Sequence, residues 1–169
     1  MGADDESFRM HTDGIAPAES PVEYAEATTL VLEYVGELED DLAFRHANEE
    51  LGDLQEEYVA PDGRLLIAWM DGAAVGCAGV RRATTDICEL TRHYVRSSAR
   101  GKGVGRRLVE AAMAEARKLG FRRMRLDVLP TMRPAIAVYR ALGFRDAPAH
   151  RDYGKASVLF LEADLGKRL

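Results

Sequence analysis

The chain has 169 residues, of which 47% are hydrophobic and 30% are charged, a composition typical of one folded domain and not of a disordered segment. No apolar run approaches the ~20 residues of a membrane-spanning helix. The net charge is −5, and the first residues are acidic, unlike a secretory signal peptide, so we expect a cytoplasmic protein without a membrane partner.

The charge is distributed unevenly along the chain. Residues 1–63 contain 18 acidic residues and two arginines, a net of −16, and residues 64–169 contain 10 acidic and 21 basic residues, a net of +11. Packing of these two parts side by side would give an acidic and a basic face. The basic part lacks the interleaved aromatic residues of many nucleic-acid binders, so we expect no nucleic-acid partner.

The first predicted helix has a well-defined start. Residues 1–19 contain scattered Gly, Pro, Asp and Ser and are expected to be a flexible segment, with at most a short strand at Phe8–His11. Ser20 is a capping residue, followed by proline at the first helical position and by Glu23 three residues after the cap. The helix is expected to run to Leu38, and a second short helix to cover Asn48–Glu57.

Strands and helices alternate over the rest of the chain. The sequence Asp71-Gly72 predicts a hairpin turn because glycine tolerates a positive φ. The expected strands are Leu65–Met70, Ala74–Arg81, Ile87–Val95, Arg122–Leu129, Phe144–Asp146 and Ser157–Glu162. The expected helices are Arg106–Leu119 and Arg133–Leu142. This order predicts an α/β fold, a mixed central sheet flanked by helices on both faces. Cys77 and Cys88 lie in strands without metal-ligand spacing, so we expect buried, reduced thiols and no metal site.

The segment Arg100-Gly101-Lys102-Gly103-Val104-Gly105 joins the third of these strands to the long helix. Its glycines remove side chains where backbone approaches a ligand closely. A helix N-terminus supplies unpaired N–H groups and partial positive charge, to which Arg106 and Arg107 add full charges. The segment therefore predicts a pyrophosphate site made mainly of backbone amides.

Other phosphate loops fit this segment less well. A P-loop ends in Gly-Lys-Ser/Thr, whereas Gly105 is followed by two arginines. The dinucleotide fingerprint requires glycine or alanine where Arg106 stands. Taken alone, the segment also fits a structural turn decorated with arginines.

Two motifs together resemble the GNAT superfamily of N-acetyltransferases. The glycine-rich segment matches that family's Arg/Gln-x-x-Gly-x-Gly/Ala pattern, which grips the pyrophosphate of acetyl-CoA, and AIAVYRALGF resembles its short helix that carries tyrosine and ends in Leu-Gly-Phe. The strand CELTRHYV lies where the family places the strand that pairs with the pantetheine arm. The resemblance extends from Leu65 to Phe144 and through the N-terminal helices, outside residues 1–19, and implies a single GNAT domain over 20–169.

The resemblance implies acetyl-CoA as cosubstrate and no metal. The residues that it places at the cofactor are Tyr94, Val95, Arg100, Gly101, Lys102, Gly103, Val104, Gly105 and Arg106. Many members have asparagine seven residues before the helix tyrosine, in contact with the cofactor. Here Met132 occupies that place, so this hydrogen bond is absent or supplied by another group.

Acetyl transfer to an amine requires an uncharged nitrogen. A lysine-like amine with a pKa near 10.4 needs about 4–5 kcal/mol to be neutral at pH 7, and a general base contributes about 10²–10⁴ in rate. Glu89, eleven residues before Arg100, resembles the strand glutamate that some members use as base, and the alternative is a strand glutamate paired with arginine. His93, placed on the same face by strand alternation, and Asp127 are further candidates.

Tyr139 matches the family tyrosine that donates a proton to the leaving thiolate. Alone, it would also fit the buried stripe of its helix, together with Ala135, Val138 and Leu142. The backbone N–H groups of Tyr94 or Val95 are natural donors to the thioester oxygen.

The leading interpretation is therefore an N-acetyltransferase acting on a primary amine of a small molecule or peptide by direct attack in a ternary complex. Catalytically idle acetyl-CoA binding, as a sensor or interaction module, is the alternative. A nucleic-acid binder is a third, which predicts steep salt dependence and no affinity for CoA. If the acidic N-terminal helices wall the acceptor pocket, their field favours a cationic amine. The sequence leaves open the acceptor and whether the protein is a homodimer.

Overall fold

The computed structural model describes residues 11–38 and 52–166. Within them, seven strands form one sheet in the order β1-β2-β3-β4-β5-β7-β6, in which the pair β4–β5 is parallel and the other pairs are antiparallel. The strands are β1 (Gly14–Pro17), β2 (Gly63–Met70), β3 (Ala73–Arg82), β4 (Ile87–Val95), β5 (Arg123–Val128), β6 (Arg145–Asp146) and β7 (Leu159–Asp164). The helices are α1 (Pro21–Glu37), α3 (Leu54–Glu57), the 3₁₀ turn η2 (Ser97–Ala99), α4 (Val104–Lys118) and α5 (Arg133–Ala141).

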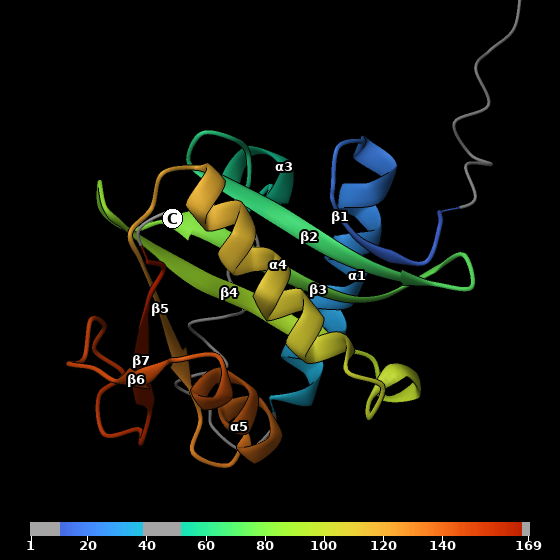
Figure 1. Ribbon diagram of the computed structural model, residues 1–169. Coiled ribbons are helices and arrows are strands. Elements are labelled where there is room, and N and C mark those ends of the chain that lie inside the picture. The colour runs from blue at the N-terminus through green and yellow to red at the C-terminus, as the bar shows by residue number, and fades with distance from the viewer. Residues whose placement is uncertain (1–10, 39–51, 167–169) are drawn as a thin grey trace, which may run out of the picture.

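Helices cover both faces of the sheet. Figure 1 shows α4 across one face and α1 behind the opposite one. Successive side chains of β2 point to opposite faces of the sheet. Leu66 and Ala68 pack with α4, and Leu65 and Ile67 pack with α1. The predicted α/β architecture with helices on both faces is confirmed. In the described part of the chain, no helix is both long and apolar enough to cross a bilayer.

Local signals predicted two elements correctly. At the start of α1, the Ser20 hydroxyl accepts from the Glu23 amide at 3.2 Å, and the Glu23 carboxylate accepts from the Ser20 amide at 3.0 Å. At the hairpin between β2 and β3, Asp71 and Gly72 have φ values of 52° and 80°, the left-handed conformation that such a turn requires.

The N-terminal expectations needed correction. The short strand lies at Gly14–Pro17, inside the segment expected to be flexible, and pairs with Leu66–Trp69 of β2. The expected strand at Phe8–His11 falls mostly outside the described residues, and His11 belongs to no element. Of the helix expected at Asn48–Glu57, residues 48–51 lie outside the described residues, and only Leu54–Glu57 is helical, as the single turn α3.

A bulge in β4 changes which side chains share a face. Thr91 pairs with Gly79 and Tyr94 pairs with Cys77, so two residues of β4, Arg92 and His93, stand opposite one residue of β3. Arg92 has a φ of 53°, which accommodates the extra residue. The prediction that His93 shares a face with Glu89 was therefore wrong, because it assumed uninterrupted alternation.

The parallel strands β4 and β5 separate beyond a short paired stretch. Pairing joins Ile87–Glu89 to Arg123–Arg125 and then stops. The strands diverge from that point in Figure 1. Among the described strands, none pairs with the edge of β4 from Leu90 to Val95 on this side, and the candidate site lies along this edge.

Candidate functional site

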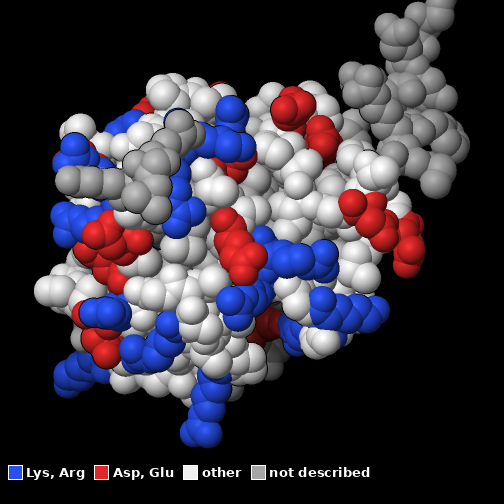
Figure 2. All heavy atoms as spheres, in the orientation of Figure 1, with Lys and Arg blue, Asp and Glu red and all other residues white. Residues whose placement is uncertain are grey.

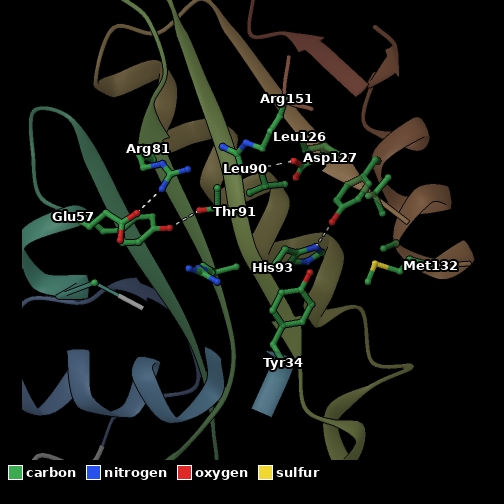
Figure 3. Close-up of a pocket in the computed structure, with 16 residues that line it drawn as sticks. Tyr34, Glu57, Arg81, Leu90, Thr91, His93, Leu126, Asp127, Met132 and Arg151 are labelled. Atoms are coloured by element: carbon green, nitrogen blue, oxygen red, sulfur yellow. Dashed lines mark hydrogen bonds and ion pairs between the residues drawn. The ribbon is translucent and has the colours of Figure 1, made fainter. Parts of the chain in front are cut away.

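A cavity of about 550 Å³ fills the gap where β4 and β5 diverge. Its walls come from Leu90–His93 of β4, Leu126–Val128 of β5, Tyr139 of α5 and Tyr34 of α1. Figure 3 shows these side chains converging from both sides of the sheet. Because the gap cuts through the sheet, groups from α1 and from α5 reach the same space.

The glycine-rich segment leads directly into α4. Gly101 and Gly103 have φ values of 77° and 78°, and an added Cβ at either would meet nothing within 4 Å. The helix begins at Val104, two residues earlier than predicted, and its first hydrogen bond runs from the Arg107 amide to the Gly103 carbonyl at 3.1 Å. The amides of Val104, Gly105 and Arg106 precede that bond and lie at the positive end of the helix. This arrangement fits a pyrophosphate.

The arginines of the segment are held by protein groups. Arg100 donates to the Val95 carbonyl at 2.9 Å and to Glu37 of α1 at 2.8 Å. Arg106 donates to Glu110 within α4 at 2.9 Å. The Arg100 side chain therefore links the glycine-rich segment to β4 and to α1.

Of the two amides expected at the thioester, that of Val95 has the better position. The Arg96 amide bonds to the Val75 carbonyl of β3, so alternation directs the amide of Val95 to the opposite, open edge. The Tyr94 amide then faces β3. The Tyr94 side chain points to α1, where its hydroxyl donates to Glu37 at 3.0 Å.

Tyr139, His93 and Gly105 form a chain of hydrogen bonds beside the cavity. Nε2 of His93 lies 2.9 Å from the Gly105 carbonyl, and Nδ1 lies 2.8 Å from the Tyr139 hydroxyl. A carbonyl only accepts, so Nε2 carries the hydrogen, and in the neutral ring Nδ1 accepts from Tyr139. Burial lowers the pKa of His93 to about 4, although the bond to Gly105 opposes this shift. Burial also raises the pKa of Tyr139.

Glu89, the predicted base, is surrounded by three arginines. Oε1 accepts from Arg125 at 2.9 Å, and Oε2 accepts from both Arg81 and Arg151 at 3.3 Å. Burial alone would raise the pKa of Glu89, but the hydrogen bond from Arg125 and the charges of Arg151 and Arg81 lower it. A carboxylate held in its charged form in this way is a weak proton acceptor. The base assignment stays a prediction, and these contacts count against it.

Asp127, the other acidic candidate, is also engaged. Its carboxylate accepts from the Tyr153 hydroxyl and lies 3.9 Å from Nη1 of Arg151. Met132 lines the cavity at the N-cap of α5 and makes no side-chain capping bond.

Several groups around the cavity were not found from sequence. Tyr34, Arg81 and Arg151 line it, and the hydroxyl of Tyr58 bonds to that of Thr91 at 2.7 Å. Tyr34, Tyr58, Arg81 and Arg151 come from four separate segments and belong to no local motif. The one available signal was for Tyr34, which follows Leu30 and Val31 at the four- and three-residue spacing of one helix face.

Some acidic residues in the described N-terminal part pair with basic residues of the rest of the chain. Glu33 of α1 forms a two-point ion pair with Arg96, at 2.9 and 2.8 Å. Glu37 pairs with Arg100. On the face shown in Figure 2, acidic and basic side chains are interspersed. Part of the charge asymmetry is therefore neutralised where α1 meets the β4 end.

The described residues contain no group of three or more His, Cys, Asp or Glu side chains placed to hold a metal ion. Cys77 and Cys88 are buried free thiols, as expected. The groups that the described site offers for binding and catalysis are therefore backbone amides, a Tyr–His pair and ion-paired arginines.

Comparison with known proteins agrees with this geometry. The model of the acetyltransferase (GNAT) family matches residues 31–144. An uncharacterized N-acetyltransferase of Schizosaccharomyces pombe is 31% identical over 90% of this chain and 95% of its own, and an IAA acetyltransferase of Azospirillum brasilense is 34% identical over 87% and 95%. A Salmonella typhimurium acetyltransferase solved with acetyl-CoA has the same fold, with a TM-score of 0.67 and 18% identity over 94% of this chain and 97% of that chain.

The protein is thus an acyltransferase by fold and sequence. It belongs to the GNAT family of acetyltransferases.

Proposed function

We propose that the protein transfers the acetyl group of acetyl-CoA to a primary amine of a small molecule or peptide, by direct attack within a ternary complex. The observation that carries this proposal is that His93, which lines the cavity between β4 and β5, is hydrogen-bonded to Gly105 in the first turn of α4, whose N-terminus can receive an anion. The Salmonella relative solved with acetyl-CoA supports the choice of acyl donor.

In this proposal the backbone between Arg100 and Arg106 binds the pyrophosphate of acetyl-CoA. The open edge of β4 receives the pantetheine arm, because its backbone groups have no neighbouring strand. The Val95 amide then faces the thioester oxygen and stabilises the negative charge that the oxygen gains as the amine attacks.

Proton movement is assigned to Tyr139 and His93. A carbon–nitrogen bond forms, a carbon–sulfur bond breaks, and one proton must leave nitrogen while one reaches sulfur. The Tyr139 oxygen accepts the proton from nitrogen while its own proton passes to Nδ1 of His93, 2.8 Å away. Tyr139 then protonates the leaving sulfur, and His93 returns its proton. Both residues end as they began.

The test follows free CoA with a thiol reagent across a panel of primary amines. We expect acetyl-CoA-dependent release with some amines, loss of release in Tyr139→Phe, and unchanged release in Arg145→Gln, an exposed arginine of β6 outside the cavity. Acetyl-CoA binding without turnover on any amine would support the idle module instead. Absence of binding heat with both CoA and acetyl-CoA would refute the proposal.

A further inference from the structure

Two guanidinium groups meet at one wall of the cavity. Arg81 of β3 and Arg151 of the loop between β6 and β7 both line it, and their side chains are 33% and 37% exposed. Each places Nη2 3.3 Å from the same atom, Oε2 of Glu89. Glu89, with Arg125 on its other oxygen, therefore holds two like charges together. Figure 3 shows both labelled arginines at one end of the cavity.

Among the described residues, carboxylates do not outnumber guanidiniums at this wall. Among the described residues, the cavity lining holds two carboxylates, Glu57 and Asp127, and a third guanidinium besides this pair, that of Arg92. With Glu89 and Arg125 directly behind, the count is three carboxylates against four guanidiniums. The charges of the described lining therefore do not support the expectation of a cationic acceptor.

Hydrogen-bond donors remain on the two arginines. A guanidinium has five N–H donors. Arg81 directs donors to Glu57 and Glu89, and Arg151 directs donors to Glu89 and to the Tyr153 hydroxyl, while Asp127 lies 3.9 Å from it. These contacts leave N–H groups on both arginines for a planar anion, which guanidiniums bind in a two-point geometry.

Resting on the proposed function, we propose that the acceptor is an amine that also carries a carboxylate, and that Arg81 and Arg151 bind this carboxylate. Glu89 is then a positioning residue for the pair. The amine end of the acceptor lies toward Tyr139 and His93, which are hydrogen-bonded to each other and line the same cavity. The carboxylate fixes which end of the molecule reaches the thioester, a positioning effect of the kind that anchoring arginines supply.

The test uses acceptors that differ only at the carboxyl group. For a set of amino acids of increasing chain length, kcat/KM is compared with that of the corresponding carboxamides and of the decarboxylated amines. We expect the wild-type enzyme to prefer the carboxylates by about tenfold or more, the loss expected when one charge-assisted contact is removed. Arg151→Gln should abolish this preference through KM, Arg151→Lys should restore part of it, and Arg145→Gln should leave it intact.

A binding measurement separates this inference from the proposed function. Calorimetry of the protein–CoA complex with a carboxylate and its carboxamide requires no turnover, and we expect heat only with the carboxylate and only when Arg151 is present. If carboxamides or cationic amines are acetylated with the same efficiency as carboxylates, the inference is overturned. The acetyltransferase proposal still stands in that case. An unchanged preference in folded Arg151→Gln, checked by its thermal melt, would also overturn it.

Discussion

The Tyr139 hydroxyl donates its hydrogen bond to Nδ1 of His93 at 2.8 Å, because Nε2 of the same ring is committed to the Gly105 carbonyl at 2.9 Å. Gly105 belongs to the first turn of α4, so the segment expected at the pyrophosphate also sets the tautomer of the histidine. The histidine in turn accepts the Tyr139 proton in a hydrogen bond, which leaves a lone pair on the Tyr139 oxygen available. Tyr139 can therefore take a proton before it gives one.

Replacing Tyr139 with phenylalanine removes this proton exchange and little packing. We expect kcat to fall by about 10²-fold or more, with a KM for acetyl-CoA near that of the wild type because the backbone amides remain in place. Steady-state CoA release measures both constants. A variant with unchanged kcat would show that Tyr139 only packs against Phe144, its aromatic neighbour at 5.7 Å.

His93→Gln tests the relay through pH. In the folded protein the His93 pKa is lowered to about 4 from its ordinary value of 6.5, so the unfolded chain binds more protons between these values. The stability contributed by neutral His93 is complete above pH 6.5 and is lost as pH falls toward 4. We expect the difference in free energy of unfolding between wild type and His93→Gln, from denaturant titrations, to shrink over that window.

The same variant separates a relay from a packing role. If His93 only holds Tyr139 in place, glutamine, which also offers an acceptor, should keep most of the activity. A relay instead predicts a loss of kcat comparable with that of Tyr139→Phe, and no further loss in the double variant. Additive losses would contradict the relay.

The substitution Gly103→Ala tests the pyrophosphate site. Gly120→Ala, at the other end of the same helix, is the matched control. Gly103 and Gly120 both have positive φ, 78° and 92°, and open space at the Cβ position. Alanine at either should cost about 1–2 kcal/mol of stability through backbone strain. Only Gly103→Ala should weaken CoA binding in calorimetry, by about tenfold, since one backbone amide contact to phosphate is worth about 1.5 kcal/mol. Equal CoA affinities in the two variants would show that this segment does not bind the pyrophosphate.

Features set by neighbouring residues were predictable from the sequence. The capping box at Ser20, the turn at Asp71-Gly72 and the glycine-rich start of α4 each depend on a few adjacent residues. The strand β1 was missed because its four residues are ordered by pairing with β2, some 50 residues away in the chain, and carry no strong strand pattern of their own.

The composition of the site depended on contacts that local patterns do not encode. Glu89 meets Arg81, Arg125 and Arg151, which lie 8, 36 and 62 residues away in the sequence. The bulge at Arg92 moved His93 to the face of α4 and so brought it to Tyr139. Strand periodicity therefore identified the residue types near the site but paired His93 with the wrong partner.

Glu89→Gln distinguishes the role of base from that of positioning residue. As a base, Glu89 would be needed for the chemical step, and its loss would lower kcat by about 10² or more and change the acid limb of the pH–rate profile. As the group that holds Arg81 and Arg151 together, it should affect mainly the acceptor KM, with a kcat within about threefold of the wild type. The two constants, measured with a carboxylate-bearing amine, decide between these roles.

The stability of the same variant gives an independent check. Removing one partner of a buried ion pair costs about 3–5 kcal/mol, and we expect about 2–3 kcal/mol here because the arginines keep some contact with water. The pKa of Glu89 is lowered from 4.5, so this contribution is complete above that pH and is lost as pH falls through the folded value. Glu162→Gln is the matched control, since its pair with Arg123 at 2.9 Å is more exposed and should contribute at most about 1 kcal/mol. Urea titrations over a series of pH values from 7 downward should show a large effect of Glu89→Gln at pH 7 that shrinks only below pH 4.5. Equal, small effects of both substitutions would mean that Glu89 does not hold the arginines.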